Sequence, residues 1–234
     1  MIRLMLGGGG DRKDSRLLDE AFAEWVGAEG HLLYLPIALR GIIPFASCEV
    51  WFRQIFEPLG LTRIAMWTEL EHKTAADLAA FDAIYIGGGN TFGLLAELRA
   101  TGFEQVLCDF AQAGQPIYGG SAGAALLGRT IETIAHIDEN WVGLIDLTGL
   151  DLVNGHAVWV HYAAADDQQI WNFVEREQTP VIAIAERGGV IVEGDKLTTV
   201  GFEAAFRFDR SGNRTAIPSR PSFCGERVYE LRTN

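Results

Sequence analysis

Residues 83–98 read AIYIGGGNTFGLLAEL: a short apolar run, three consecutive glycines, and then apolar residues at helical spacing. The run Ala83–Ile86 is apolar enough to be buried on both faces of a sheet, which is typical of parallel strands. A helix is expected from about residue 91, with Asn90 or Thr91 as its N-cap. A buried strand, a tight turn and a helix in this order predict an α/β fold.

The same alternation of short apolar runs and amphipathic segments fills the first half of the chain. The expected strands cover residues 2–6, 31–35, 63–67, 83–86 and 116–118; the expected helices cover 17–26, 50–59, a short segment after the capping-box sequence at 74–77, 91–100 and 103–113. Strands that alternate with helices at this rhythm predict βαβ units and a parallel sheet covered on both faces.

The second half of the chain has a different pattern. It predicts an extended segment at 152–162 with Asn154-Gly155 as a candidate turn, a helix at 166–177, a buried strand at 181–185, and hairpins at 190–200 and 205–217. No linker, repeat or low-complexity segment interrupts the chain. We therefore expect a single domain over residues 1–234, a three-layer αβα sandwich with a mostly parallel sheet and C-terminal antiparallel hairpins.

The composition is that of an ordinary soluble protein, with 234 residues of which 48% are hydrophobic and 21% charged. A net charge of −12 disfavours nucleic acid or an anionic membrane surface as the main partner. The three cysteines, Cys48, Cys108 and Cys224, have no close spacing, so we expect reduced thiols rather than disulfides or a metal site. The chain shows no signal-peptide profile and no membrane-length apolar run, which predicts a cytoplasmic protein.

A second glycine cluster, at residues 118–128, reads YGGSAGAALLG and has Ser121 at its centre. It matches G-x-S-x-G between an expected strand and an expected helix, the context in which a serine is held on a strained turn with its hydroxyl exposed. The N–H groups from Ala122 onward lie at a helix N-terminus and suit an oxyanion. Such turns also bind anions without catalysis, so the pattern alone leaves both interpretations open.

Two further glycine runs are expected at the same edge of the sheet as Ser121. Gly87–Gly89 follows the strand at 83–86, and its N–H groups are candidates for the second half of an oxyanion hole. Gly7–Gly10 follows the first strand, but Arg12 stands where G-x-G-x-x-G requires its third glycine. A dinucleotide site is therefore not favoured.

A nucleophilic serine needs a base, and the base needs an acidic partner to fix its tautomer. His161 ends an apolar stretch just before a polar run, at a strand-to-helix junction where functional groups are common. Glu186 ends the expected strand at 181–185 and is the leading candidate for the acid. Asp138 is its rival, and the spacing does not exclude Glu132 or Asp151.

These motifs resemble those of the serine peptidases of the peptidase E (aspartyl dipeptidase) and cyanophycinase family, peptidase family S51. That family shares the flavodoxin-like fold of class I glutamine amidotransferases. The resemblance spans about residues 80 to 200 and is carried by the segments 86–92, 94–95, 120–124, 161–162, 182–186 and 192–195.

The resemblance implies that Ser121 is the nucleophile, His161 the general base and Glu186 its acidic partner. It also suggests oxyanion donors at Gly89 and Ala122. It further implies catalysis without a metal or another cofactor.

We also expect Asn90 and Tyr162 to contact the substrate, and the protein to be a monomer or a homodimer. The order Ser–His–Glu differs from the Ser–Asp–His order of α/β-hydrolases, and Asp138 stays the alternative acid. A glutamine amidotransferase would have cysteine at the position of Ser121.

One feature departs from the family pattern. Aspartyl dipeptidases carry an arginine soon after the catalytic histidine, which holds the side-chain carboxylate of the substrate. Here residues 163–169 are small, polar and acidic, and the next cation is Arg176. Binding of an N-terminal aspartate would therefore need a cation from elsewhere, for which the candidates are Arg40, Arg53, Arg187 and Arg207.

The sequence therefore predicts a serine exopeptidase that hydrolyses dipeptides or short peptides, including by resemblance those with N-terminal aspartate, through an acyl-enzyme. Two alternatives stay open. One is a non-catalytic protein of the same fold that binds a small anion at the glycine turns. The other is an esterase or amidase with a Ser–Asp–His triad in which Asp138 is the acid.

Overall fold

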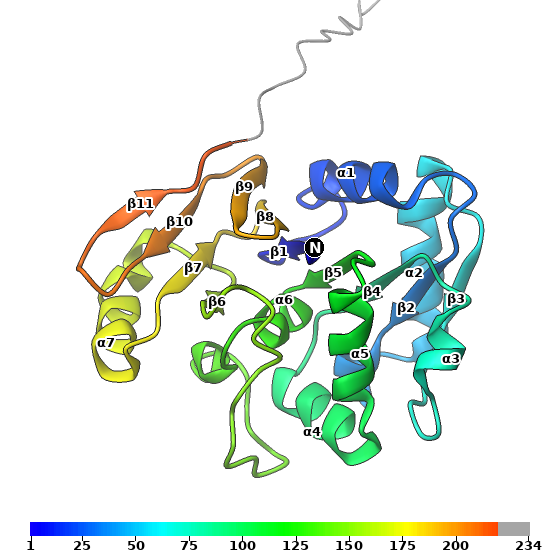
Figure 1. Cartoon of the computed structure of the whole chain (residues 1–234), viewed down its shortest axis with the longest axis horizontal. Helices are drawn as coiled ribbons and strands as arrows, with labels where there is room; N and C mark the ends of the chain where they lie inside the picture. The colour runs from blue at the N-terminus through cyan, green and yellow to red at the C-terminus, as the bar shows by residue number, and fades with distance from the viewer. Residues whose placement is uncertain (220–234) are drawn as a thin grey trace, which may run out of the picture.

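The computed structural model describes residues 1–219, and its main sheet crosses the molecule from β3 to β9 (Figure 1). The sheet has seven strands in the order β3-β2-β4-β5-β1-β8-β9. Their bounds are β1 (Arg3–Gly7), β2 (Leu32–Leu35), β3 (Ile64–Met66), β4 (Ala83–Ile86), β5 (Ile117–Gly120), β8 (Gly188–Glu193) and β9 (Lys196–Gly201). The first five strands are parallel, and β8 and β9 extend the sheet antiparallel beside β1. The expected mostly parallel sheet is confirmed.

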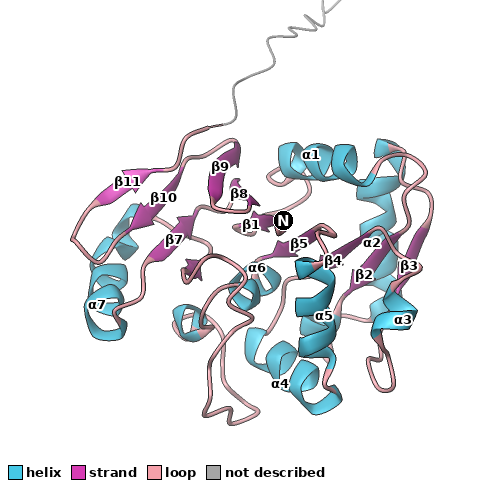
Figure 2. Cartoon of the chain, viewed as in Figure 1, coloured by secondary structure: helices cyan, strands magenta, loops and turns pink. Residues whose placement is uncertain are grey.

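Helices cover both faces of this sheet (Figures 1 and 2). They are α1 (Arg16–Val26), α2 (Phe45–Phe56), α3 (Ala75–Leu78), α4 (Thr91–Thr101), α5 (Phe103–Gln112), α6 (Ala122–Leu127) and α7 (Asp167–Glu177), with 3₁₀ turns η1 (Ile37–Leu39), η2 (Glu57–Leu59), η3 (Glu132–Ile134) and η4 (Ala164–Asp166). Because successive strand residues point to opposite faces, Leu4 and Leu6 join the core under α4, α5 and α6, whereas Met5 joins the core under α1 and α2. The three-layer αβα arrangement is confirmed.

A second sheet of four strands stands at the left of Figure 2, with α7 beside it. Its order is β11-β10-β7-β6, with bounds β6 (Ala157–Trp159), β7 (Val181–Ile184), β10 (Ala205–Phe208) and β11 (Arg214–Ala216). The two hairpins expected from the sequence are present, β8–β9 in the main sheet and β10–β11 in the second. The extended segment expected at 152–162 is shorter, because Asn154 and Gly155 adopt positive φ and turn the chain before β6.

Three tyrosines lie side by side across the main sheet, and we call them the tyrosine row. Tyr34 on β2 pairs in register with Tyr85 on β4, which pairs with Tyr118 on β5. Their ring centroids are 5.7 Å and 4.5 Å apart, and Phe52 of α2 stacks on Tyr34 at 4.1 Å. The row points to the layer formed by α1 and α2, close to the carboxyl edge of the parallel strands.

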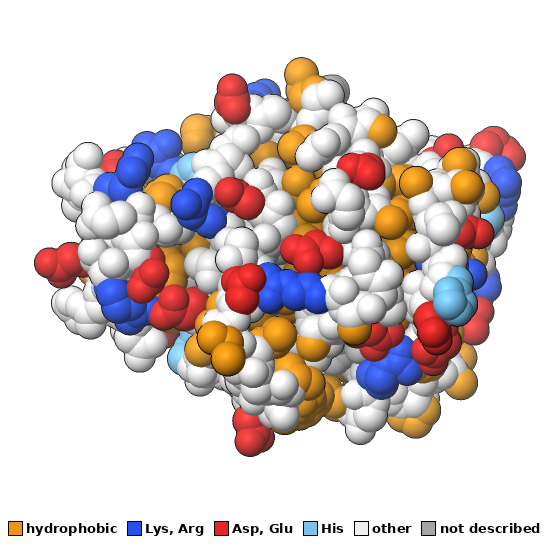
Figure 3. Space-filling view, turned by 60° about the horizontal axis from the view of Figure 1, so that its bottom comes forward, with side chains coloured by type: hydrophobic (Ala, Val, Ile, Leu, Met, Phe, Trp, Pro, Cys, Tyr) orange, Lys and Arg blue, Asp and Glu red, His pale blue; other side chains and the backbone are white. Residues whose placement is uncertain are grey.

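The surface carries charges of both signs, and hydrophobic side chains gather in the lower middle of the face in Figure 3. The loop at 137–145 is one source of exposed apolar area, through Ile137, Trp141, Val142 and Ile145. Cys48 is buried and Cys108 half-buried, both as free thiols, and Cys224 lies outside the described residues. Among residues 1–219, no helix combines the length and apolarity that a bilayer crossing requires.

Candidate active site

Ser121 stands on the tight turn between β5 and α6. Its φ of 49° and ψ of −108° are unusual for a residue with a side chain, and its N–H donates to the carbonyl oxygen of Gly7 at 2.9 Å. The neighbouring positions have no room for a side chain. A Cβ on Gly119 would lie 2.5 Å from the backbone of Gly123, and one on Gly123 would lie 2.4 Å from the carbonyl oxygen of Ile86. The structure therefore has the strained strand-to-helix turn that the sequence predicts.

Two successive hydrogen bonds connect Ser121 to His161 and His161 to Glu186. Nε2 of His161 is 2.8 Å from Oγ of Ser121, and Nδ1 is 3.0 Å from Oε1 of Glu186. Because an ionised carboxylate only accepts hydrogen bonds, Nδ1 carries the proton that faces Glu186. Nε2 is then left to accept the hydrogen bond from the serine hydroxyl.

The two partners differ in exposure. The side chain of His161 is 30% exposed and that of Glu186 is 59% exposed. Water therefore screens the carboxylate charge, and the hydrogen bond to Nδ1 orients the imidazole ring more than it stabilises its charge. His161 itself has a φ of 53°, so two of the three residues are held on left-handed backbone.

The glycine run, Gly7–Gly10, connects these residues through its backbone. The carbonyl oxygen of Gly7 accepts from Ser121, and that of Gly8 accepts from the N–H of His161 at 2.9 Å. The N–H of Gly8 donates to the carbonyl oxygen of Gly188 at 3.1 Å, which joins the run to β8. One short segment thus fixes the backbone of the serine and of the histidine.

No side chain fits on Gly8 or Gly9, because other parts of the chain pack directly against their backbone. A Cβ on Gly8 would lie 2.0 Å from the carbonyl oxygen of Ala185, and a Cβ on Gly9 would lie 2.2 Å from Cε1 of His161. This role of the glycine run was not predicted from the sequence. The run follows a predicted strand at the correct edge, which is a signal for a functional turn, but the residues that approach it come from far along the chain.

The rival acid Asp138 lies elsewhere. Its Oδ2 accepts the N–H of Thr91 at 2.7 Å, at the N-terminus of α4, where a carboxylate satisfies a free helix donor. Asn90 caps the same helix, since its Oδ1 accepts from the N–H of Gly93 at 2.8 Å and its Nδ2 donates to the carbonyl oxygen of Glu139 at 2.9 Å. Both polar ends of the Asn90 side chain are therefore engaged within the protein.

Tyr162 is buried next to His161 but faces the second sheet. Its hydroxyl donates to Oδ1 of Asp167 at 2.7 Å and accepts from Nη2 of Arg214 at 2.8 Å. Burial and the Asp167 carboxylate raise the pKa of Tyr162 to about 12, so the hydroxyl stays neutral at physiological pH.

The loop after β4 faces the serine turn, as expected. A Cβ on Gly88 would lie 3.2 Å from Cβ of Ser121, whereas one on Gly89, with φ 128°, would lie 2.3 Å from the carbonyl oxygen of Ala38. Ala122 is fully buried at the start of α6. Within the described residues, the backbone N–H groups of Gly89 and Ala122 donate to no protein acceptor.

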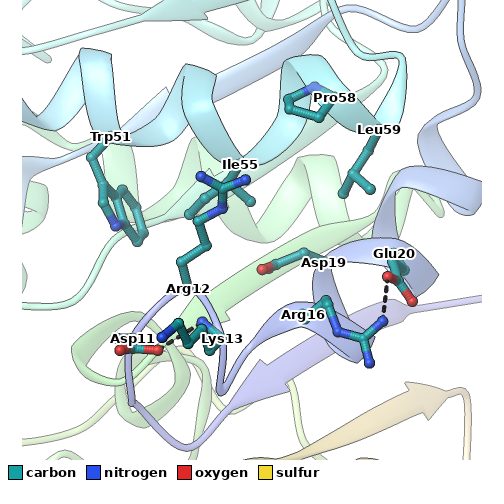
Figure 4. A pocket seen from close by; sticks show the side chains of 10 residues that line it. All are labelled: Asp11, Arg12, Lys13, Arg16, Asp19, Glu20, Trp51, Ile55, Pro58 and Leu59. Carbon is teal, nitrogen blue, oxygen red and sulfur yellow. Dashed lines mark hydrogen bonds and ion pairs between the residues drawn. The ribbon is translucent and has the colours of Figure 1, made fainter. Parts of the chain in front are cut away.

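A cavity of about 420 Å³ opens beside Ser121. The tyrosine row forms part of its lining, and the side chains of Leu39, Ile43 and Trp51 also face it. A second cavity, of about 560 Å³, lies between α1, the loop before it and α2. Trp51 lines both cavities, and Figure 4 shows the Arg12 side chain of the second one reaching toward α2.

Asp19 is a buried carboxyl group on α1 between these two cavities. It accepts from Oγ of Ser15 at 2.7 Å and is hydrogen-bonded to Tyr118. Burial raises its pKa to about 7, because a desolvated carboxylate is costly and no cation among residues 1–219 forms an ion pair with it.

The raised pKa of Asp19 predicts a pH-dependent stability. Between about pH 4 and 7 the folded state keeps a proton that the unfolded state has lost, so the free energy of unfolding falls as pH rises through this window. Asp19→Asn is expected to reduce that fall by on the order of 2–4 kcal/mol, measured by urea unfolding at pH 5 and pH 8.

Glu20→Gln is the matched control, because Glu20 lies next along α1 with an exposed side chain paired to Arg16. It is expected to leave the pH dependence of unfolding unchanged. Equal slopes for the wild type and Asp19→Asn would contradict the assignment.

Comparison with known proteins gives consistent matches. The model of peptidase family S51 matches residues 4–200. Peptidase E from Shewanella amazonensis is 31% identical over 187 residues, which cover 75% of this chain and 80% of that protein. A probable alpha-aspartyl dipeptidase from Drosophila melanogaster is 27% identical over 193 residues, 77% of each chain.

Solved structures agree with the sequence matches. A putative peptidase E protein from Listeria monocytogenes superposes with a TM-score of 0.68 at 25% identity, covering 87% of this chain and all of that one. A peptidase from an acI-B1 actinobacterium shares the fold, with a TM-score of 0.69 at 18% identity over 94% of this chain and 96% of that one.

Proposed function

Since the chain belongs to peptidase family S51, we propose that it is a serine exopeptidase that hydrolyses dipeptides or short peptides through an acyl-enzyme. Ser121 is the nucleophile, His161 the general base and Glu186 the residue that orients it. The observation that carries this proposal is the pair of hydrogen bonds that connects the three residues: Oγ of Ser121 to Nε2 of His161 at 2.8 Å, and Nδ1 of His161 to Oε1 of Glu186 at 3.0 Å. A nucleophile within reach of an oriented base is the arrangement that acyl transfer needs.

The proposed reaction has two halves. Oγ of Ser121 attacks the peptide carbonyl carbon while its proton passes to Nε2 of His161, and the tetrahedral intermediate collapses as the same proton goes to the leaving amine. Water then enters, gives a proton to Nε2 and attacks the acyl-enzyme. Ser121 recovers its proton when the carboxylic acid product leaves.

The negative charge of the tetrahedral intermediate needs hydrogen-bond donors. We assign this role to the N–H groups of Gly89, which follows the Gly88 that lies against Ser121, and of Ala122, which follows Ser121; neither has a protein acceptor within the described residues. One such donor contributes about 10²–10³-fold in kcat in a serine peptidase. Substrate contacts from Asn90 and Tyr162 stay predictions.

The direct test of the proposal is labelling with a fluorophosphonate, which reacts with a serine only when the base has activated it. We expect one adduct per chain, located on Ser121 by mass spectrometry, together with hydrolysis of at least some dipeptides in a panel. A folded protein that is not labelled and cleaves no dipeptide would contradict the proposal.

Glu186→Gln separates the acid proposed here from its rival. The amide presents N–H groups to Nδ1 and disfavours the required tautomer, so we expect kcat to fall by about 10²–10⁴-fold with little change in KM. The measurement is steady-state hydrolysis of a good dipeptide substrate.

Asp138→Asn is the matched control, with the same loss of one charge. Because Asp138 bonds the N–H of Thr91, we expect this variant to lose about 1 kcal/mol of unfolding free energy and to keep its kcat. The reverse result, a large loss of kcat in Asp138→Asn alone, would assign the acid to Asp138.

A further inference from the structure

We propose that the cavity over the tyrosine row holds the side chain of the residue whose carbonyl Ser121 attacks, and that it selects an uncharged, largely apolar side chain rather than a carboxylate. The inference rests on the proposed role of Ser121 and adds the substrate class. It predicts cleavage after residues such as leucine, methionine or phenylalanine.

The first argument is position. Ser121 lines the cavity together with Gly88 and Gly120, so the space begins at the nucleophile itself. The tyrosine row lines it further in, and Ile43 and Trp51 line it as partly exposed side chains. A peptide bound with its carbonyl at Oγ has this cavity within reach of the adjacent side chain.

The second argument is the absence of a cation. No lysine, arginine or histidine within the described residues lines this cavity. The four arginines that the sequence offers for a substrate carboxylate each have a carboxylate partner in the protein: Arg40 with Glu97 at 2.8 Å, Arg53 with Glu49 at 2.9 Å, Arg187 with Asp14 at 3.2 Å and Arg207 with Asp209 at 3.9 Å. None of them is in place to hold an N-terminal aspartate.

Two other cations lie nearby but face a different space. Arg12 and Lys13 line the second cavity, whose lining includes Trp51 and Ile55 of α2 but not Ser121 (Figure 4). Arg12 and Lys13 therefore do not pair with the substrate side chain next to the attacked carbonyl.

The third argument is the charge that does face the tyrosine row. Asp19 is hydrogen-bonded to Ser15 and Tyr118, which both line the cavity. Burial first, and then the charge of Asp19, raise the pKa of Tyr85 and of Tyr118 well above the usual value, so both hydroxyls stay neutral. A substrate carboxylate entering here would lose its water and meet an acidic group.

The hydroxyl groups of Tyr34 and Tyr85 add a polar element without a charge. Among the described residues neither hydroxyl has a hydrogen-bond partner, and both residues line the cavity although Tyr34 is only 1% and Tyr85 only 6% exposed. Each can bond a neutral polar tip, such as an amide or a thioether, at the end of an apolar side chain. The lining thus favours neutral side chains over charged ones.

The first experiment compares kcat/KM of the wild-type enzyme for Leu-Ala, Met-Ala, Phe-Ala and Asp-Ala. We expect the best neutral substrate to exceed Asp-Ala by about 100-fold or more, which is the scale on which a site rejects a group it leaves unpaired. Equal or faster hydrolysis of Asp-Ala, abolished in Ser121→Ala, would overturn the inference and leave the proposed function standing. If no dipeptide is hydrolysed and Ser121 is not labelled, both the inference and the proposed function are contradicted.

The second experiment adds a cation at the cavity. Ile43→Arg changes a side chain that lines the cavity and is 43% exposed, so the variant is expected to fold. We expect it to raise the ratio of kcat/KM for Asp-Ala over Leu-Ala by about 10-fold or more. Ile42→Arg adds the same charge at an adjacent, exposed residue outside the cavity lining and is expected to leave the ratio unchanged. Equal ratios in the two variants would contradict the assignment of the cavity.

Discussion

Replacing Ser121 with alanine is expected to lower kcat for dipeptide hydrolysis by about 10⁵–10⁶-fold and to abolish fluorophosphonate labelling. The physical reason is that the change removes Oγ, the proposed nucleophilic atom, which lies 2.8 Å from Nε2 of His161. Alanine keeps the Cβ and the backbone conformation of the turn, so the circular dichroism spectrum should not change. Steady-state kinetics with the best dipeptide of the panel make the measurement.

Two further variants make this result specific. Ser121→Ala combined with His161→Ala should cost about as much as either change alone, because the residues act as one unit. Ser121→Gly should be inactive yet more stable by about 1 kcal/mol, since glycine adopts a φ of 49° without strain. Retention of most of the activity in Ser121→Ala would exclude Ser121 as the nucleophile.

Replacing Gly9 with alanine is expected to lower kcat by about 100-fold or more, although no residue of the proposed triad is replaced. The new Cβ would lie 2.2 Å from Cε1 of His161 and 2.5 Å from Nδ1, so the imidazole ring must move away from Ser121 or Glu186. A displacement of about 1 Å in a catalytic group is enough for a loss of this size. The rate of fluorophosphonate labelling, which depends on the base, should fall with kcat.

Gly27→Ala is the control for the backbone. Gly27 also has a positive φ, of 75°, but a Cβ there meets nothing within 4 Å. It should therefore lose about 1 kcal/mol of unfolding free energy and keep its activity. If Gly9→Ala is as active as Gly27→Ala, the glycine run does not position His161.

Local patterns in the sequence were sufficient for the alternating strands and helices and for the serine turn. The apolar run at 83–86 and its glycines specify a buried strand and a turn with no help from distant residues, and the G-x-S-x-G sequence does the same at Ser121. The family resemblance is confirmed by the match over residues 4–200. The catalytic roles of Ser121, His161 and Glu186 stay predictions that the geometry supports.

Features that depend on contacts between distant segments were not predictable in this way. Nothing local in β8 shows that it pairs with β1, and nothing local in residues 152–185 shows that β6 and β7 form a sheet of their own. The ion pairs of Arg40 and Arg187 are equally non-local, since their partners, Glu97 and Asp14, lie far away along the chain. For this reason the sequence offered both arginines as substrate contacts, whereas the structure engages them within the protein.

The glycine run also has a consequence for the nascent chain. It is made first, yet its geometry depends on Gly188 and His161, which leave the ribosome much later. At synthesis rates of about 5–20 residues per second, His161, the proposed base, is added about 2–8 seconds after Ser121. With His161 as the proposed base, Ser121 is therefore unreactive until His161 has been synthesised, and the backbone contacts of the glycine run are complete only when β8 pairs with β1.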